Sequence, residues 1–190
     1  MLYRMETTKT NFEIALKWIF HAEGGYVNDP KDPGGATRYG ISLRYLKGKG
    51  KLGDIDGDGD IDTDDIKELT KSKAAELYRV DFWDKCNCDK LPLPLAIIIF
   101  DQAVNTGVRT AARSLQRHTG AKVDGVIGKQ TIARAIAKFR HNPTWFVASY
   151  MSRRAKYYHK ITIQNTTFNK FIKGWFIRLF DLQQFIMEHG

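Results

Sequence analysis

Residues 23–40, "EGGYVNDPKDPGGATRYG", decide how this chain folds. They follow apolar side chains at helical spacing over residues 11–22, and Gly24-Gly25 ends that helix. The Asp-Pro, Pro-Gly and Gly-Gly pairs behind the glycines predict turns and short strands over residues 26–41. The stretch therefore predicts a small β excursion directly after a helix.

The rest of the chain has the pattern of a helical protein, so the expected fold class is α+β, mainly α. Ser42 is positioned to cap a short helix, and the apolar run at 93–104 predicts a buried helix. Further helices are expected at residues 63–82, 108–118, 129–139, 143–160 and 168–187. The last of these carries apolar side chains at helical spacing, which predict a core-facing stripe: Phe168, Phe171, Ile172, Trp175, Phe176, Leu179, Leu182 and Phe185. A basic amphipathic helix that perturbs an outer membrane is the alternative for this segment.

The net charge of +9 is unevenly distributed along the 190 residues. Residues 1–105 hold 15 basic and 18 acidic side chains, a net of −3, whereas residues 106–190 hold 15 basic and 3 acidic ones, a net of +12. The second part is therefore expected to meet an anionic partner, such as a bacterial wall or a lipid surface. No nucleic-acid-binding motif is present, so nucleic acid is not the expected partner. Cys86 and Cys88 are too close in sequence for an unstrained disulfide and are expected to be reduced thiols.

An acidic loop at residues 54–65, "DIDGDGDIDTDD", has the spacing of an EF-hand calcium loop. Gly59 stands at the sixth position, where the loop must turn sharply, and Ile61 stands at the apolar eighth position. The last ligand is Asp65 instead of the usual Glu, as in loops of the dockerin type. The expected ligands of one structural or regulatory calcium ion are Asp54, Asp56, Asp58, Asp60, Asp62 and Asp65, with Asp60 contributing its backbone carbonyl. A disordered acidic run is the alternative.

Glu23 has the features of a general acid. It stands in the last turn of the first helix, where unpaired carbonyls disfavour an anion and so favour the protonated form. A glycosidase needs a second carboxylate across the sugar, and Asp32 and Asp29 compete for that role. Thr37 is a candidate for holding a water, or else makes a local turn hydrogen bond, and Tyr39 either lines the cleft or packs against the small sheet.

The spacing of Glu23, Asp32 and Thr37 resembles the Glu–Asp–Thr triad of phage-type lysozymes, with one residue fewer before the threonine. The sequence of residues 23–42 resembles glycoside hydrolase family 108, the phage and bacterial N-acetylmuramidases, still more closely. Further similar stretches follow in order: "FDQAVNTG" at 100–107, "DGVIGKQT" at 124–131 and "GWFIR" at 174–178. The resemblance extends from about residue 11 to residue 188, and the calcium loop looks like an insertion in it.

This resemblance implies a lysozyme-like fold and hydrolysis of the β-1,4 bond between N-acetylmuramic acid and N-acetylglucosamine in peptidoglycan. Glu23 matches the catalytic glutamate, Asp32 and Thr37 follow from the phage-lysozyme spacing, and the reaction is expected to invert the anomeric carbon. Gln102 and Asn105 are candidates for contacts with acetamido groups, although Asn105 is equally placed to cap the next helix. We expect one domain over residues 1–190, with a catalytic lobe at 11–105, the calcium insertion at about 48–70, and a basic helical peptidoglycan-binding lobe at 106–190.

The expected protein is a monomeric endolysin that acts on peptidoglycan, with an anionic outer-membrane surface as a second candidate partner. The first residues contain no signal-peptide apolar region, which predicts synthesis in the host cytoplasm and access to the wall through a holin-type pore. Two alternatives remain open at this point. One is a wall-binding or secretion-assisting protein of the same fold with weak or no catalysis, and the other is a calcium-responsive adaptor.

Overall fold

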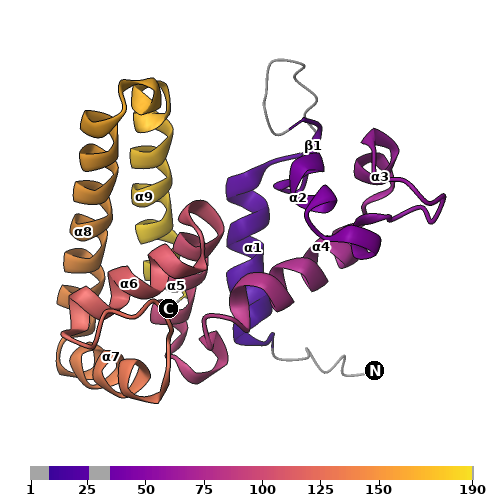
Figure 1. Cartoon of the computed structure of the whole chain (residues 1–190). Coiled ribbons are helices and arrows are strands. Elements are labelled where there is room, and N and C mark those ends of the chain that lie inside the picture. Colours follow the sequence, from indigo (N-terminus) through magenta and orange to yellow (C-terminus); the bar gives the residue numbers. More distant parts are fainter. Residues whose placement is uncertain (1–8, 26–34, 190) are drawn as a thin grey trace, which may run out of the picture. The chain divides into compact units, whose positions relative to one another are not determined.

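The computed structural model describes residues 9–25 and 35–189, which are mostly helical (Figure 1). The chain divides into two compact units. One contains Ile19–Arg79, and the other contains the residues up to Trp18 together with those from Val80 onward. Helix α1 (Asn11–Glu23) therefore contributes its first turns to one unit and its last turns to the other.

The unit of residues 19–79 holds a two-stranded antiparallel sheet and short helices. Strand β1 (Thr37–Arg38) pairs with β2 (Ile41–Ser42), with Thr37 opposite Ser42 and Arg38 opposite Ile41. The helices are α2 (Leu43–Lys47), the 3-10 turn η1 (Gly50–Gly53), α3 (Thr63–Glu68) and α4 (Lys71–Tyr78). The apolar core of this unit is formed by fully buried side chains from several of these elements: Ile19, Ile41, Leu46, Ile66, Leu69, Ala74 and Tyr78.

Local capping confirms one sequence prediction in this unit and corrects another. The Ser42 hydroxyl accepts a hydrogen bond from the backbone N–H of Tyr45, so Ser42 caps α2 as expected. The single helix expected over residues 63–82 is wrong. Helix α3 ends at Glu68, Leu69 adopts a non-helical conformation, and Thr70 caps α4 by accepting from the backbone N–H of Lys73. The helix then widens into a π-helical turn, η2 (Arg79–Trp83).

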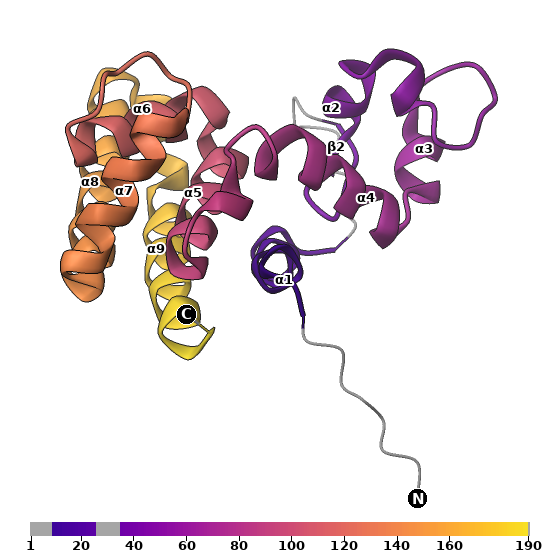
Figure 2. The ribbon, with the colours of Figure 1, turned by 90° about the horizontal axis from the view of Figure 1, so that it is seen from below.

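The other unit is a helical bundle around α5 (Leu93–Thr106), which is buried from Leu95 to Ala103. Helices α6 (Val108–Thr119), α8 (Pro143–Gln164) and α9 (Asn169–His189) pack against α5, and α7 (Lys129–His141) packs against α6 and α8. Helices α8 and α9 form an antiparallel hairpin through the 3-10 turn η4 (Thr166–Phe168), as Figures 1 and 2 show. A further 3-10 turn, η3 (Cys88–Lys90), precedes α5, and both cysteines of this region are buried free thiols.

Helix α9 differs from the expected apolar stripe. Leu179 and Leu182 of that stripe are buried, but Phe171 is 45% exposed, and the buried face continues to Ile186 instead. The reason is that α9 contacts only α5, α8 and η4 to an appreciable extent, so part of its apolar surface has no helix to cover it within the described bundle. No helix in the described residues has an apolar stretch long enough to cross a membrane.

Candidate functional site

Glu23 ends helix α1 and lies against the turn of the β-hairpin. Gly24 follows with a φ of 75°, the left-handed conformation that ends many helices. A Cβ placed on Gly40 would lie 2.7 Å from both Cβ and Cγ of Glu23. Because real atoms do not approach so closely, Gly40 is required here, and the stem of Glu23 is held directly against the hairpin backbone.

The hairpin turn has the geometry that antiparallel strands favour. Tyr39 and Gly40 form a two-residue loop in which both residues have positive φ, 53° and 78°, as type I′ turns require. The strained Tyr39 is secured by Tyr78, whose hydroxyl donates to the Tyr39 carbonyl over 2.9 Å. Phe20 packs edge-on against the rings of both tyrosines, at 5.8 Å and 6.1 Å between centroids. Tyr39 therefore belongs to the packing that fixes the end of α1 to the hairpin.

Thr37 begins β1 and is partly exposed. Its hydroxyl donates to the carbonyl of Gly35 over 3.3 Å, the local turn bond that the sequence allowed as an alternative. This bond uses the hydroxyl proton and leaves the oxygen able to accept from a water. Asp29 and Asp32, the two candidates for the second carboxylate, lie outside the described residues.

The polar side chains proposed on α5 belong to the helical bundle. Gln102 is buried, and its Oε1 accepts a hydrogen bond from the Tyr150 hydroxyl over 2.6 Å. Asn105 accepts from the Tyr158 hydroxyl over 2.7 Å. Asn105 does not cap the next helix, because the N-cap position of α6 is occupied by Gly107. Both amides are therefore tied to tyrosines of α8.

Sequence reasoning missed a buried ionic cluster beside these amides. The carboxylate of Asp101 is fully buried and accepts from Trp18 Nε1 over 2.7 Å. It forms ion pairs with Arg154 at 2.7 Å and with Arg178 at 2.8 Å. Burial alone would raise the pKa of Asp101, but Arg178 and Arg154 outweigh this effect and hold the pKa below its usual value. The only signal in the sequence was an aspartate and an arginine at apolar helix positions.

The acidic loop between η1 and α3 is folded by its own side chains. Asp54 accepts hydrogen bonds from the backbone N–H groups of Gly57, at 2.7 Å, and Gly59, at 3.1 Å. Asp65 is buried and closes the loop from the other side, because it accepts from Ile55 at 2.5 Å and from Asp62 at 2.6 Å. Asp65, at the twelfth position, thus joins the two ends of the predicted calcium loop, and Asp54, at the first position, folds its first half.

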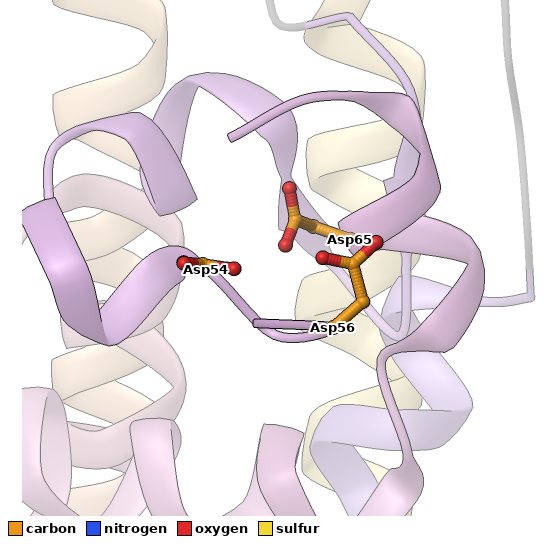
Figure 3. Close-up of side chains that lie close together, drawn as sticks. All are labelled: Asp54, Asp56 and Asp65. Atoms are coloured by element: carbon orange, nitrogen blue, oxygen red, sulfur yellow. The ribbon is translucent and has the colours of Figure 1, made fainter. Parts of the chain in front are cut away.

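Two groups of carboxylates converge inside this loop. Oxygens of Asp54, Asp56 and Asp65 lie within 4.8 Å of one another, and Figure 3 shows these side chains facing one another across the loop interior. Asp60, Asp62 and Asp65 form a second such group. Asp58 belongs to neither group in the described loop, and its carboxylate accepts from the backbone N–H of Asp60. The crowding raises the pKa of Asp60, with the carboxylate of Asp58 as the main cause.

These carboxylates offer the hard oxygen ligands that calcium prefers. Asp65 is shared by both groups, so a cation beside it would contact side chains from each end of the loop. The structure therefore brings the expected side-chain ligands Asp54, Asp56, Asp62 and Asp65 into these two groups. Asp60 joins the second group through its carboxylate, not through the backbone carbonyl that the sequence predicted, and Asp58 would have to turn toward the ion.

Comparison with known proteins covers most of the chain. Residues 16–107 match the family described as Glycosyl hydrolase 108, and residues 110–180 match the family described as "Predicted Peptidoglycan domain". The structure of SagA from Brucella abortus is 32% identical, with a TM-score of 0.75 over 93% of this chain and 94% of that one. No curated protein matches the sequence. The lysozyme-like, mainly helical fold and the peptidoglycan-hydrolase activity expected from the sequence are thereby confirmed at this level. The chain belongs to the glycosyl hydrolase 108 family and is a glycoside hydrolase that acts on peptidoglycan.

Proposed function

We propose that this hydrolase is an N-acetylmuramidase and that Glu23 is its general acid. The observation that carries this proposal is the close approach of Cβ and Cγ of Glu23 to Gly40, which holds the stem of the side chain beside the hairpin that bears Thr37. A general acid must be held in one geometry to protonate the glycosidic oxygen as the bond breaks. The turn around Tyr39 and Gly40 supplies this fixed position.

The second carboxylate, Asp32 or Asp29, would activate a water on the opposite face of the sugar. Thr37 supports this role because its oxygen is free to accept a hydrogen bond from that water. Direct attack by water inverts the anomeric carbon and needs carboxyl groups roughly 6.5–9.5 Å apart, whereas retention needs about 5–5.5 Å. We propose inversion, with cleavage of the β-1,4 bond that follows N-acetylmuramic acid.

Substitution of Glu23 by Gln tests the general acid. Glu23→Gln should keep the fold by circular dichroism and lose lysis of purified sacculi by at least about a hundredfold, the usual contribution of a general acid. Glu68→Gln is the matched control, since Glu68 is an exposed glutamate of the same unit at the end of α3. Lysis by Glu23→Gln at the rate of this control would end the assignment.

Analysis of the released muropeptides tests the bond. New reducing N-acetylmuramic ends identify a muramidase, whereas anhydro ends identify a lytic transglycosylase. The anomer formed first, followed by NMR before mutarotation, decides between inversion and retention. Comparison of Asp32→Asn with Asp29→Asn then identifies the second carboxylate as the variant with the larger loss of kcat.

We also propose that the acidic loop binds one calcium ion. The support is the convergence of the carboxylates of Asp54, Asp56, Asp60, Asp62 and Asp65 on a loop whose ends are already joined. Calcium bound there would neutralise the mutual repulsion of these side chains and stiffen the region around residues 48–70. Its role would be structural, because both carboxylate groups found among the described residues belong to this one loop, and a second acidic loop that could pair with it is not among them.

A further inference from the structure

A basic cavity lies among helices α6, α7 and α8 of the helical bundle, whose arrangement Figure 2 shows. Its volume is about 820 Å³. Six cationic side chains line it: Arg113, Arg117, Lys138, Arg153, Lys156 and Lys160. No aspartate or glutamate is among the described residues of its wall.

The cations are arranged by helical spacing. Arg113 and Arg117 are one turn apart on α6, and Arg153, Lys156 and Lys160 follow one another at intervals of three and four residues on α8. Residues at these intervals share one face of a helix. The two helices therefore present two rows of positive charge to the same cavity.

The cations of the cavity are not neutralised by carboxylates of the described residues. None of the six cations forms an ion pair within the described part of the chain. The Nε of Arg153 is buried and has no hydrogen-bond partner among the described residues. Like charges that face one another destabilise a fold, and a buried donor without a partner costs further free energy. Such an arrangement is what a site for a multiply charged anion requires.

The cavity also offers flat apolar surface between the charges. Trp145 is 52% exposed, stacks against His118 at 6.0 Å between ring centroids, and lies 5.2 Å from Lys138 Nζ. Tyr157 lines the wall beside the cationic row of α8. Rings of this kind pack against aliphatic or sugar groups, so the site suits a ligand in which apolar parts separate the charged ones.

We propose that this basic cavity binds the peptide stems of peptidoglycan through their free carboxylates. This inference rests on the proposed muramidase activity toward peptidoglycan, and every lining residue except Gln102 lies within the segment similar to a peptidoglycan domain. The stems carry spaced carboxylates between apolar side chains, which matches both the charges and the rings. The cavity thus recognises the peptide part of the polymer and leaves the glycan to the hydrolytic unit. Arginine holds carboxylates in two-pronged contacts, and lysine adds point charges.

Binding to two forms of the wall tests the proposal. The intact protein is sedimented at 4 °C with purified sacculi and with the same sacculi after an amidase has removed the stems. The amidase leaves one lactyl carboxylate on each muramic acid, so some salt-dependent binding to the stripped glycan remains, but its affinity should be at least about tenfold lower than that of intact sacculi. Equal affinity for both forms would overturn the inference.

A charge-matched pair of variants locates the binding surface. Arg153→Gln/Lys156→Gln/Lys160→Gln removes three charges from the cavity, and Lys129→Gln/Lys170→Gln/Lys173→Gln removes three exposed charges elsewhere. The first should bind intact sacculi at least about tenfold more weakly, since each contact contributes a modest amount, whereas the second should change affinity less than about twofold. If the triple variant unfolds, Lys156→Gln/Lys160→Gln, at two exposed positions, replaces it. Equal losses in both variants would show that only net charge matters and would refute the site.

Two further measurements separate the outcomes. Soluble stem tripeptide should displace the protein from sacculi. Inorganic polyphosphate at the same concentration of negative charge should displace it no more strongly than the tripeptide does. Stronger competition by polyphosphate would overturn the proposal in favour of a phosphate-bearing ligand. Lysis of sacculi is measured separately from binding. Lysis without stem-dependent binding would refute stem recognition by the cavity and leave the proposed muramidase activity standing. Stem-dependent binding without lysis would support stem recognition and refute the proposed muramidase activity.

Discussion

Asp101 is expected to contribute strongly to the free energy of unfolding through its buried ion pairs. It neutralises the fully buried Arg154 and also pairs with Arg178. Asp101→Asn would leave Arg154 as a buried charge without compensation, which destabilises proteins by about 3–5 kcal/mol. Urea unfolding followed by circular dichroism measures the change.

Asp181→Asn is the control for this prediction. Asp181 is an exposed aspartate on α9, and its substitution should change the free energy of unfolding by no more than about 0.5 kcal/mol. A loss at Asp101 as small as the loss at Asp181 would show that the cluster contributes no net stability.

His118 predicts how stability depends on pH. Burial, with added effects of Lys138 and Arg153, lowers the pKa of His118 to about 4. Between about pH 6.5 and pH 4, His118 is protonated in the unfolded chain, where the pKa of histidine is near 6.5, but stays neutral in the folded chain. Stability should therefore decrease as the pH falls through this window, by up to about 2 kcal/mol after allowance for solvent screening.

Thermal unfolding at pH 6.5 and pH 4.5 measures this effect in matched variants. His118→Phe keeps an aromatic ring beside Phe146 and Tyr150 and removes the titrating group, so its Tm should depend less on pH than that of the parent. His141→Phe, at an exposed position on α7, should retain the dependence of the parent. Identical pH profiles for all three proteins would exclude His118 as the source.

At the level of single residues, the sequence indicated structural positions best where a local pattern is enough. Glu23 before two glycines is such a pattern, because the helix end can be placed from neighbouring residues. The partners of Asp101 could not be found this way, since Trp18 and Arg178 lie far from it along the chain and meet it only after the bundle packs. The packing of Gly40 on Glu23 was hidden for the same reason.

Among the elements, the acidic loop makes the clearest prediction. If the loop binds calcium, then removal of calcium by excess chelator should lower the Tm, with a loss of about 2.7 kcal/mol when free calcium had been at a hundred times its Kd. Hydrogen exchange should become faster mainly in residues 48–70. An unchanged Tm in excess chelator would contradict this prediction.

Two substitutions distinguish a calcium site from a general effect of acidic charge. Asp56→Asn alters the group formed with Asp54 and Asp65, and it should weaken the protection by calcium. Asp64→Asn removes the same charge from an exposed aspartate that pairs with Lys67 and lies outside both carboxylate groups. The second variant should respond to calcium as the parent does.

The types of most elements followed from the sequence, but one boundary did not. Periodicity and glycine placement located α1, the hairpin and the bundle helices, because long amphipathic patterns are strong signals. The break between α3 and α4 was missed because apolar spacing continues through it. Thr70 starts a new helix there, and Leu69 fills the core of its unit instead of continuing α3.

At the scale of the whole molecule, the sequence showed where positive charge is concentrated along the chain, and the folded bundle showed which of these charges line one cavity. The excess of positive charge after residue 105 predicted an anionic partner, and the peptidoglycan domain match agrees with that expectation. Which cations face one cavity could not be predicted, since they come from three helices. The second carboxylate, expected at Asp32 or Asp29, stays a prediction.

The division of the chain predicts how fragments behave. The two family matches meet between residues 107 and 110, but the compact units divide at residues 18 and 79. A fragment of residues 108–190 would lack Asp101 and leave Arg154 buried without its counterion. We expect this fragment to give little cooperative thermal unfolding, and a fragment of residues 80–190 to unfold more cooperatively. Equal cooperativity in both fragments would contradict this expectation.

The Trp18–Asp101 hydrogen bond also bears on the history and engineering of such enzymes. The first turns of α1 complete the helical bundle, while its last residue is the proposed acid of the other unit. A wall-recognition cassette cannot therefore be exchanged between relatives by joining genes at the family boundary. Recombination that preserves function would have to replace the hydrolytic segment as an internal insert, with its two junctions inside α1 and near residue 79.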